Sequence, residues 1–313
     1  TPEPHYMLAM ANQGLPWWKA LAELIDNSFD AKADRVEIII KGRTVTIKDN
    51  GWGIADVVGS LRLGGHRPMN GRGLGVYGVG LKDAWLSFGD KIDIVTVREE
   101  HKTTLTVDTK QFSANWEGPD PVTESSSDAS GTKITLYLRQ GKNRPSVEVF
   151  KRLGQVFSPA IVQGKQVVIA RGKQSKPLAA VALPEFDGSV QDTFEIGGKV
   201  VSINIGVLKP GERMEDGPFL FAHRHRIIEA SSLGTKLMSG LSMGGQVTLG
   251  DGWVFTKNKD SISENCDELE EAIFTRIEHL LIKADQASID VQSTQIRTEL
   301  ASMLNSAVKT ARR

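Results

Sequence analysis

The sequence predicts an α+β protein of two domains followed by C-terminal helices, and three observations support this prediction. The chain has 313 residues, more than a single domain of roughly 100–200 residues usually holds. β-Branched runs typical of strands occur between segments whose apolar residues recur every three or four positions, as on a helix. This helical spacing continues through the last part of the chain. We therefore expect domains over residues 1–150 and 151–263, and helices over residues 264–313.

The composition is that of a folded globular protein. The chain has 38 basic and 38 acidic residues and is 40% hydrophobic, which excludes long disorder. A net charge of zero argues against a broad basic surface for nucleic acid or an anionic membrane. The single cysteine, Cys266, excludes an internal disulfide. Because the sequence also lacks an apolar membrane span and a secretory signal, we expect a cytoplasmic protein.

The first expected element is an amphipathic helix over residues 14–32, where Trp17, Leu21 and Leu24 share one face. Two β-branched runs joined by Gly42-Arg43 predict a hairpin. A polar segment over residues 113–131 predicts an exposed loop. Further helices are expected after residue 55, over residues 79–88 and over residues 147–157, and further strands over residues 91–97, 102–107 and 132–138.

The second domain is expected to be rich in strands. A boundary between residues 145 and 160 would separate it from the first domain. Its expected strands cover residues 166–170, 193–196, 200–208 and 219–228.

Glycine is concentrated in one part of the chain. Eleven of the 31 glycines fall between Gly51 and Gly89, which indicates sharp bends or a close approach of a ligand to the backbone. The segment Gly73–Gly78 matches G-x-G-x-x-G, but the polar stretch before it is no buried strand, so a dinucleotide-binding fold is excluded. A P-loop is excluded because lysine does not directly follow the required glycine. Backbone N–H groups opening the next helix could still bind phosphate oxygens.

Two polar motifs accompany this loop. Glu23, Asn27 and Asp30 are four and three residues apart, so they share one face of the first helix. Glutamate can accept a proton from water and asparagine can offer an oxygen to a hard cation, although a plain solvated face is the simpler interpretation. Asp49, in the pattern Asp-x-Gly-x-Gly after a strand, could accept a hydrogen bond from an exocyclic amine or could form an ordinary turn. Thr132, at the start of another strand, could support the same carboxylate through its hydroxyl, although a plain strand is the simpler interpretation.

In this order the motifs resemble those of the GHKL ATPases, the superfamily of gyrase B, the ninety-kilodalton heat-shock chaperones, sensor histidine kinases and MutL. The resemblance covers roughly residues 10–140. It implies a two-layer α/β sandwich, the Bergerat ATP-binding fold, under a mobile glycine-rich lid. It also implies ATP and Mg²⁺ as ligands, with slow hydrolysis.

The resemblance also assigns roles to single residues. Glu23 would activate the hydrolytic water and Asn27 would bind Mg²⁺, while the role of Asp30 is left open. Sensor kinases usually have asparagine at the position of Glu23, which favours hydrolysis here. Asp49, supported by Thr132, would accept the adenine amine. The glycines of the Asp49 motif would shape the base pocket (Gly51, Gly53), and the glycine-rich loop would supply phosphate-binding backbone (Gly75, Gly78, Val79, Gly80).

A narrower resemblance links the chain to the microrchidia (MORC) and MutL ATPases. The sequence Gly75–Lys82 is similar to the MORC lid, so Lys82 would contact a phosphate. In these families a ribosomal-protein-like transducer domain inserts a lysine toward the γ-phosphate, here Lys259, with Lys257 as the alternative. The resemblance further implies an ATP-dependent homodimer that clamps DNA or a partner protein.

Other functions remain open from the sequence. The chain could be an ATP-dependent chaperone that binds client proteins, or a scaffold that binds nucleotide without hydrolysing it. A type II topoisomerase subunit is disfavoured, because no cleavage-tyrosine domain is visible. His223 and His225 lack a third metal ligand, so we expect them to be surface residues rather than a metal site.

Overall fold

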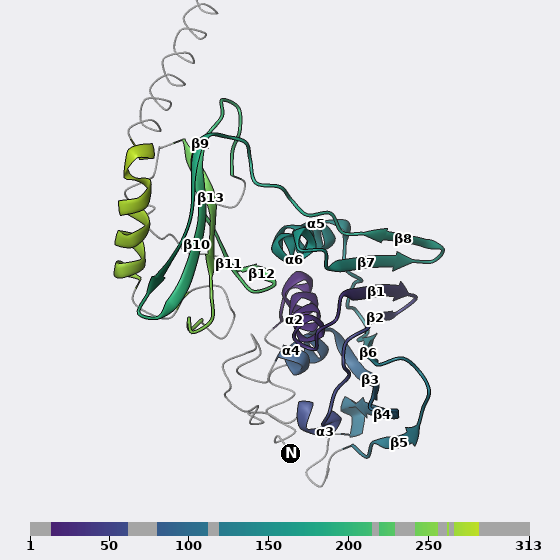
Figure 1. Cartoon of the computed structure of the whole chain (residues 1–313). Helices are drawn as coiled ribbons and strands as arrows, with labels where there is room; N and C mark the ends of the chain where they lie inside the picture. The colour runs from purple at the N-terminus through teal and green to yellow at the C-terminus, as the bar shows by residue number, and fades with distance from the viewer. Residues whose placement is uncertain are drawn as a thin grey trace, which may run out of the picture. The chain divides into compact units, whose positions relative to one another are not determined.

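The computed structural model describes residues 14–61, 80–111, 119–214, 219–228, 242–255, 262 and 266–281. The chain divides into two compact units, Thr1–Val181 and Ala182–Arg313. The first unit therefore extends beyond the boundary expected at residue 150. Its additional part includes the last two strands of the sheet of this unit. Each unit is mixed α and β and has its own hydrophobic core (Figure 1).

The first unit is built on an eight-stranded sheet with the order β5-β4-β3-β6-β2-β1-β7-β8. All neighbouring strands are antiparallel except β1 and β7, which are parallel. The strands are β1 (Arg35–Lys41), β2 (Thr44–Asp49), β3 (Gly89–Arg98), β4 (His101–Asp108), β5 (Val122–Ser125), β6 (Gly131–Leu138), β7 (Gln166–Arg171) and β8 (Gln174–Pro177).

Helices cover one face of this sheet (Figure 1). They are α2 (Trp17–Asp30), α3 (Val57–Ser60), α4 (Gly80–Phe88), α5 (Val147–Val156) and α6 (Ser158–Val162), with a short 3₁₀ turn, η1 (Thr109–Gln111). In β1, alternate residues beginning at Val36 are buried in the same core as the apolar stripe of α2.

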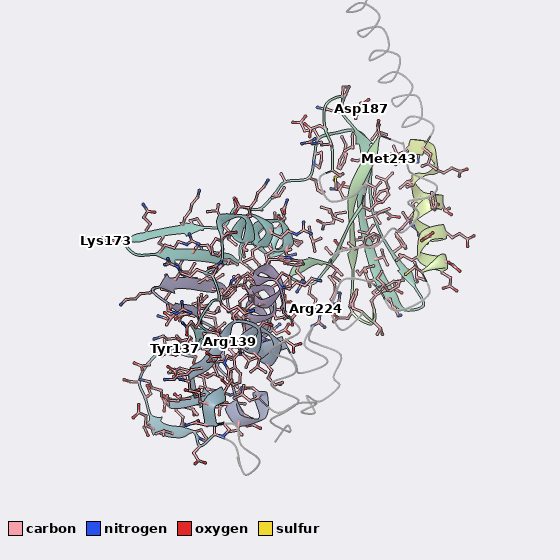
Figure 2. The ribbon with its side chains drawn as sticks, turned by 180° about the vertical axis from the view of Figure 1, so that it is seen from behind. Tyr137, Arg139, Lys173, Asp187, Arg224 and Met243 are labelled. Atoms are coloured by element: carbon pink, nitrogen blue, oxygen red, sulfur yellow. The ribbon has the colours of Figure 1, made fainter. Side chains whose placement is uncertain are left out.

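The opposite face of the sheet is polar. Tyr137 on β6 donates a hydrogen bond of 2.5 Å to Asp93 on β3, and Thr106 donates one of 2.8 Å to the same carboxylate. Figure 2 shows Tyr137 on this sheet and Lys173 at the tip of the hairpin that joins β7 to β8. The first unit is therefore a layer of helices on a sheet whose other face is polar.

Two sequence expectations about the first unit were wrong. The strand expected over residues 166–170 was assigned to the second domain, whereas β7 pairs with β1, with Arg35 opposite Gln166. The segment over residues 113–131 was expected to be a loop, but part of it forms β5 at the sheet edge, with all four residues exposed. An exposed edge strand carries no alternation of buried and exposed residues, so periodicity cannot reveal it.

The second unit has a five-stranded sheet with the order β12-β11-β13-β10-β9. The strands are β9 (Phe186–Ile196), β10 (Lys199–Leu208), β11 (Phe219–His223), β12 (Arg226–Ile228) and β13 (Met243–Leu249). A helix over residues 267–281 contributes Leu269, Ile273 and Ile277 to a core that also contains Val201 and Ile203 of β10. Among the described residues, no helix has the length and apolar character needed to cross a membrane.

Candidate functional site

The Asp49 carboxylate lies at the end of β2 and accepts hydrogen bonds from three groups. Oδ1 accepts the backbone N–H of Gly51 at 2.9 Å and that of Thr132 at 3.1 Å. Oδ2 lies 3.0 Å from the hydroxyl of Ser28 on α2. Strands β2 and β6 are neighbours, which is why Thr132 reaches Asp49 although the two are far apart in the sequence. The carboxylate is therefore held in one orientation by a turn, a strand and a helix.

Two opposing effects act on the ionisation of this carboxylate. Burial raises the pKa of Asp49 above its ordinary value, while the hydrogen bonds from Gly51, Ser28 and Thr132 lower it. Burial is the larger effect, so the net direction of the pKa shift is upward. Such a carboxylate is poised to accept a hydrogen bond from a ligand, because a further donor would offset part of the cost of burying its charge.

Glycines bring the backbone around Asp49 into close contact. A Cβ on Gly51 would lie 2.7 Å from the carbonyl oxygen of Ala31, and one on Gly53 would lie 2.4 Å from that of Val97. Gly53 also has a φ of +77°, a conformation that other residues adopt at a cost. At Gly131, a Cβ would lie 2.3 Å from the carbonyl oxygen of Asp49. These glycines are therefore required by the close packing of the backbone.

Thr132 supports Asp49 differently from the sequence expectation. Its backbone N–H, rather than its hydroxyl, contacts the carboxylate. The hydroxyl instead lies 3.2 Å from the hydroxyl of Thr96 on β3, which is 1% exposed. Thr96 also accepts the backbone N–H of Ile54 at 2.8 Å. A hydrogen-bonded chain thus connects the Gly53-Ile54 turn, β3 and the start of β6.

Helix α2 presents Glu23 and Asn27 on its partly exposed side, together with Asp30. The carboxylate of Glu23 faces the start of α4, where a Cβ on Gly80 would lie only 2.3 Å from Glu23 Oε2. Ser28, one residue after Asn27, joins the same helix to Asp49. Helix α2 therefore carries Glu23 and also contacts the carboxylate of Asp49, which belongs to β2, through Ser28.

Lys82 lies in the first part of α4 and is fully buried. Its Nζ donates a hydrogen bond of 3.1 Å to the carbonyl oxygen of Ser60, the last residue of α3. A buried ammonium group needs such partners, because leaving its donors unsatisfied is costly. Lys82 thereby links α3 to α4. The sequence expectation was that this lysine would contact a phosphate.

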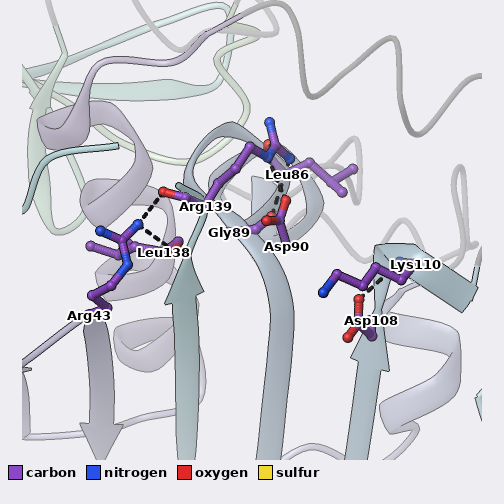
Figure 3. Close-up of polar contacts among 8 residues, drawn as sticks. All are labelled: Arg43, Leu86, Gly89, Asp90, Asp108, Lys110, Leu138 and Arg139. Carbon is purple, nitrogen blue, oxygen red and sulfur yellow. Dashed lines mark hydrogen bonds and ion pairs between the residues drawn. The ribbon is translucent and has the colours of Figure 1, made fainter. Parts of the chain in front are cut away.

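The other end of α4 is fixed by arginines (Figure 3). Arg139 donates to Asp90 at 2.5 Å and to the carbonyl oxygen of Leu86 at 3.3 Å. Arg43 in turn donates to the carbonyl oxygens of Leu138 and Arg139, at 3.0 and 2.5 Å. Because a cation near the last turn satisfies carbonyls that have no partner within the helix, Arg139 stabilises the end of α4. Helix α4 is thus tied to its surroundings at both ends.

Several predicted site residues lie outside the described residues, namely Gly75, Gly78, Val79, Lys257 and Lys259. In the second unit, His223 is 5% exposed and its Nδ1–H donates to the carbonyl oxygen of Leu249 at 2.8 Å. The expectation that His223 is a surface residue was therefore wrong. Among the described residues, no cluster of three or more His, Cys, Asp or Glu side chains could hold a metal ion.

The donor chemistry near Asn27 suits Mg²⁺ that is bound mainly by phosphates. Mg²⁺ in nucleotide sites commonly takes one or two protein oxygens and completes its shell with phosphate oxygens and water. The amide oxygen of Asn27, on the partly exposed side of α2, is a suitable oxygen of this kind.

Two residues of the site were missed by sequence reasoning. Ser28 follows Asn27 directly, so a signal for it was present in the helical motif. Thr96 lies within an ordinary alternating strand and has no local signal. Its importance depends on the pairing of β3 with β6, which places Thr96 opposite Thr132.

Part of the chain is similar to a known protein family. Residues 15–132 match the family model of the histidine kinase-, DNA gyrase B- and HSP90-like ATPases. The matched segment is less than half of the chain, and it is similar to the ATPases that this model describes. It covers α2, β1, β2, α4 and β3 through the start of β6, including Glu23, Asp49 and Thr132. No curated protein matches the chain.

Proposed function

We propose that the first unit binds ATP with Mg²⁺ and hydrolyses it slowly, and that the nucleotide controls a conformational switch. One observation carries the proposal. A single helix, α2, contributes to both ends of the site, through Ser28 at Asp49 and through Glu23 at Gly80. The family match over residues 15–132 supports the general activity.

At the base end, Asp49 would accept the exocyclic amine of adenine. Its carboxylate is oriented by backbone N–H groups and by the Ser28 hydroxyl, so little conformational freedom is lost on binding. Gly51 and Gly53 allow the backbone of the turn to pass close to a flat ring. Thr132 completes this end of the site through its backbone N–H and its hydroxyl.

At the phosphate end, Glu23 would orient and deprotonate the attacking water. Asn27 would supply a protein oxygen to Mg²⁺, which neutralises phosphate charge when bound. Backbone N–H groups at the start of α4, where the positive end of the helix dipole lies, would bind phosphate oxygens. We assign this backbone role to Gly75, Gly78, Val79 and Gly80. Because Lys82 is buried and donates to Ser60, we assign it an indirect role, in which it positions α3 beside the phosphate end.

We further propose that the nucleotide closes a glycine-rich lid and promotes homodimerisation, with Lys259 of a transducer-like second unit contacting the γ-phosphate. The supporting argument is the sequence similarity to MORC and MutL ATPases. Closure would be a population shift whose size equals the difference in nucleotide affinity between two lid states. The closed homodimer would then act as a clamp that holds DNA or a partner protein.

Calorimetry and a phosphate-release assay test this proposal. Wild-type protein should bind ATP, Asp49→Asn should abolish binding, and Glu23→Ala should bind ATP without releasing phosphate. Wild-type protein that fails to bind ATP would overturn the proposal. The clamp is tested separately by sedimentation: identical monomers with ADP and with a non-hydrolysable ATP analogue would remove dimerisation from it.

A further inference from the structure

Thr96 occupies a position that links the parts of the base site. Asp49, Thr132 and Thr96 lie on the three adjacent strands β2, β6 and β3, and Thr96 is directly opposite Thr132. Thr96 is 1% exposed and Thr132 is 6% exposed. Three hydrogen-bond contacts meet at Thr96 Oγ1: Ile54 N at 2.8 Å, the carbonyl oxygen of Gly131 at 3.2 Å and Thr132 Oγ1 at 3.2 Å.

Because the Thr96 hydroxyl has only one hydrogen, it can donate to only one of its neighbours at a time. A hydroxyl has one hydrogen to donate and two lone pairs to accept with. The Ile54 N–H can only donate, so Thr96 accepts from it. The single Thr96 hydrogen then goes either to Gly131 or to Thr132, which lie at equal distances. Only in the second arrangement does Thr132 keep its own hydrogen for a ligand.

We propose that Thr96 is a positioning residue that sets base preference, by donating to Thr132 so that Thr132 offers a hydrogen-bond donor beside the Asp49 acceptor. This inference rests on the proposed ATP site. The Watson–Crick edge of adenine carries an amine donor next to a ring-nitrogen acceptor. Guanine carries an oxygen acceptor next to an N–H donor. An acceptor at Asp49 and a donor at Thr132 therefore match adenine and oppose guanine, because mismatched buried polar groups remain unpaired.

Another threonine pair provides an internal control. Thr46 on β2 and Thr135 on β6 also form a hydroxyl contact, at 3.1 Å, in the same sheet. Thr46 is 7% exposed, so its burial is comparable to that of Thr96. Its alternate position in β2 places it on the opposite face from Asp49. Loss of the Thr46 hydroxyl therefore removes a cross-strand hydrogen bond without touching the base site.

The experiment measures Kd for ATP and GTP by calorimetry, using the full chain and non-hydrolysable analogues. Thr96→Val should weaken ATP binding about tenfold, as expected for the loss of a buried hydrogen bond, and should weaken GTP binding less. The preference for ATP over GTP should therefore shrink. Thr96→Ser keeps the hydroxyl and should keep the preference, and Thr46→Val should behave as wild type. An unchanged ATP/GTP ratio in folded Thr96→Val would overturn the inference.

A double-mutant cycle tests whether Thr96 acts through Thr132. Thr132→Val should reduce the same ATP preference, and the double variant should lose less than the product of the two single effects. Independent, multiplicative losses would contradict the inference. If Thr96→Val does not fold, the inference is tested with Thr132→Val and Thr132→Ser. A ratio of the ATP and GTP affinities that is unchanged in Thr132→Val overturns the inference. Wild-type protein that binds neither nucleotide instead removes the proposed function itself.

Discussion

Gly80, the first residue of α4, leaves no room for a side chain beside the carboxylate of Glu23. A Cβ at this position would lie 2.3 Å from Glu23 Oε2, closer than real side chains allow, and would make a tight contact of 3.3 Å with Glu23 Cβ. The absence of a side chain at Gly80 therefore decides where the Glu23 carboxylate can lie. Since Lys82 and Arg139 tie the two ends of α4 to the rest of the unit, Gly80 is not readily moved aside.

Gly80→Ala should therefore damage hydrolysis more than nucleotide binding. The added methyl group displaces the Glu23 carboxylate, and misplacing a catalytic group by about 1 Å can lower kcat on the order of a hundredfold. Steady-state phosphate release gives kcat, and calorimetry gives Kd for ATP. Gly154→Ala in α5 is the control, because its Cβ would meet the carbonyl oxygen of Ala179 at 2.7 Å, away from the site. Equal kcat in Gly80→Ala and wild type would remove this role from Gly80.

Ser28→Ala should weaken ATP binding about fivefold to tenfold, because it removes one hydrogen bond to the Asp49 carboxylate. The pKa of Asp49 should rise further, since the Ser28 hydrogen bond lowers it. Ser158→Ala is a close control. Like Ser28, Ser158 contacts the carbonyl oxygen four residues earlier, which for Ser158 belongs to Gly154 in α5, and has a second partner. If both variants lose the same affinity, Ser28 acts through folding and not through Asp49.

The affinity for ATP should fall on acidification, and the fall should begin above the ordinary Asp value of 3.8, because burial raises the pKa of Asp49. Protonation removes the negative charge that strengthens the hydrogen bond to the adenine amine. Kd is measured by calorimetry from about pH 8 downward, with circular dichroism reporting the fold at each step. Tripolyphosphate is the control, because it carries phosphates without a base. A loss of affinity shared equally by tripolyphosphate would exclude Asp49 as its source.

His223 should make the second unit less stable at mildly acidic pH. Burial lowers the pKa of His223 below its ordinary value of 6.5, and nearby Arg224 lowers it further, while hydrogen bonding to Leu249 opposes the shift. Below pH 6.5 the unfolded chain therefore takes up a proton that the folded chain does not, and the free energy of unfolding falls until the lowered pKa is reached.

Thermal unfolding at about pH 7.5 and about pH 5.5 measures this effect. His223→Gln retains an N–H donor for the Leu249 carbonyl oxygen and should show a smaller difference in Tm between the two pH values than wild type. His101→Gln, which replaces an exposed histidine, should leave the difference in Tm between the two pH values as in wild type. A wild-type pH dependence in His223→Gln would show that other groups cause it.

Local sequence patterns predicted much of the first unit. The expected helix over residues 14–32 is α2, and the expected hairpin is β1 and β2. Helical periodicity alone placed Glu23 and Asn27 on one face, because four residues make about one turn. The location of Asp49 at a strand end also followed from a short β-branched run and the glycines after it. These features depend on residues that are close together in the chain, so they can be predicted from the sequence alone.

Contacts between distant segments decided the rest. The sequence by itself determined which residues form α2, the β1–β2 hairpin and the turn that contains Gly51 and Gly53. Backbone geometry and side-chain spacing act within a few residues, so they can be recognised in the sequence. Only the tertiary structure decided that β7 joins β1, that Lys82 binds Ser60, and that Thr96 lies opposite Thr132. The physical reason is that strand neighbours and buried partners are selected by burial and hydrogen bonding across the whole unit. Such long-range selection produces no periodic pattern in the local sequence.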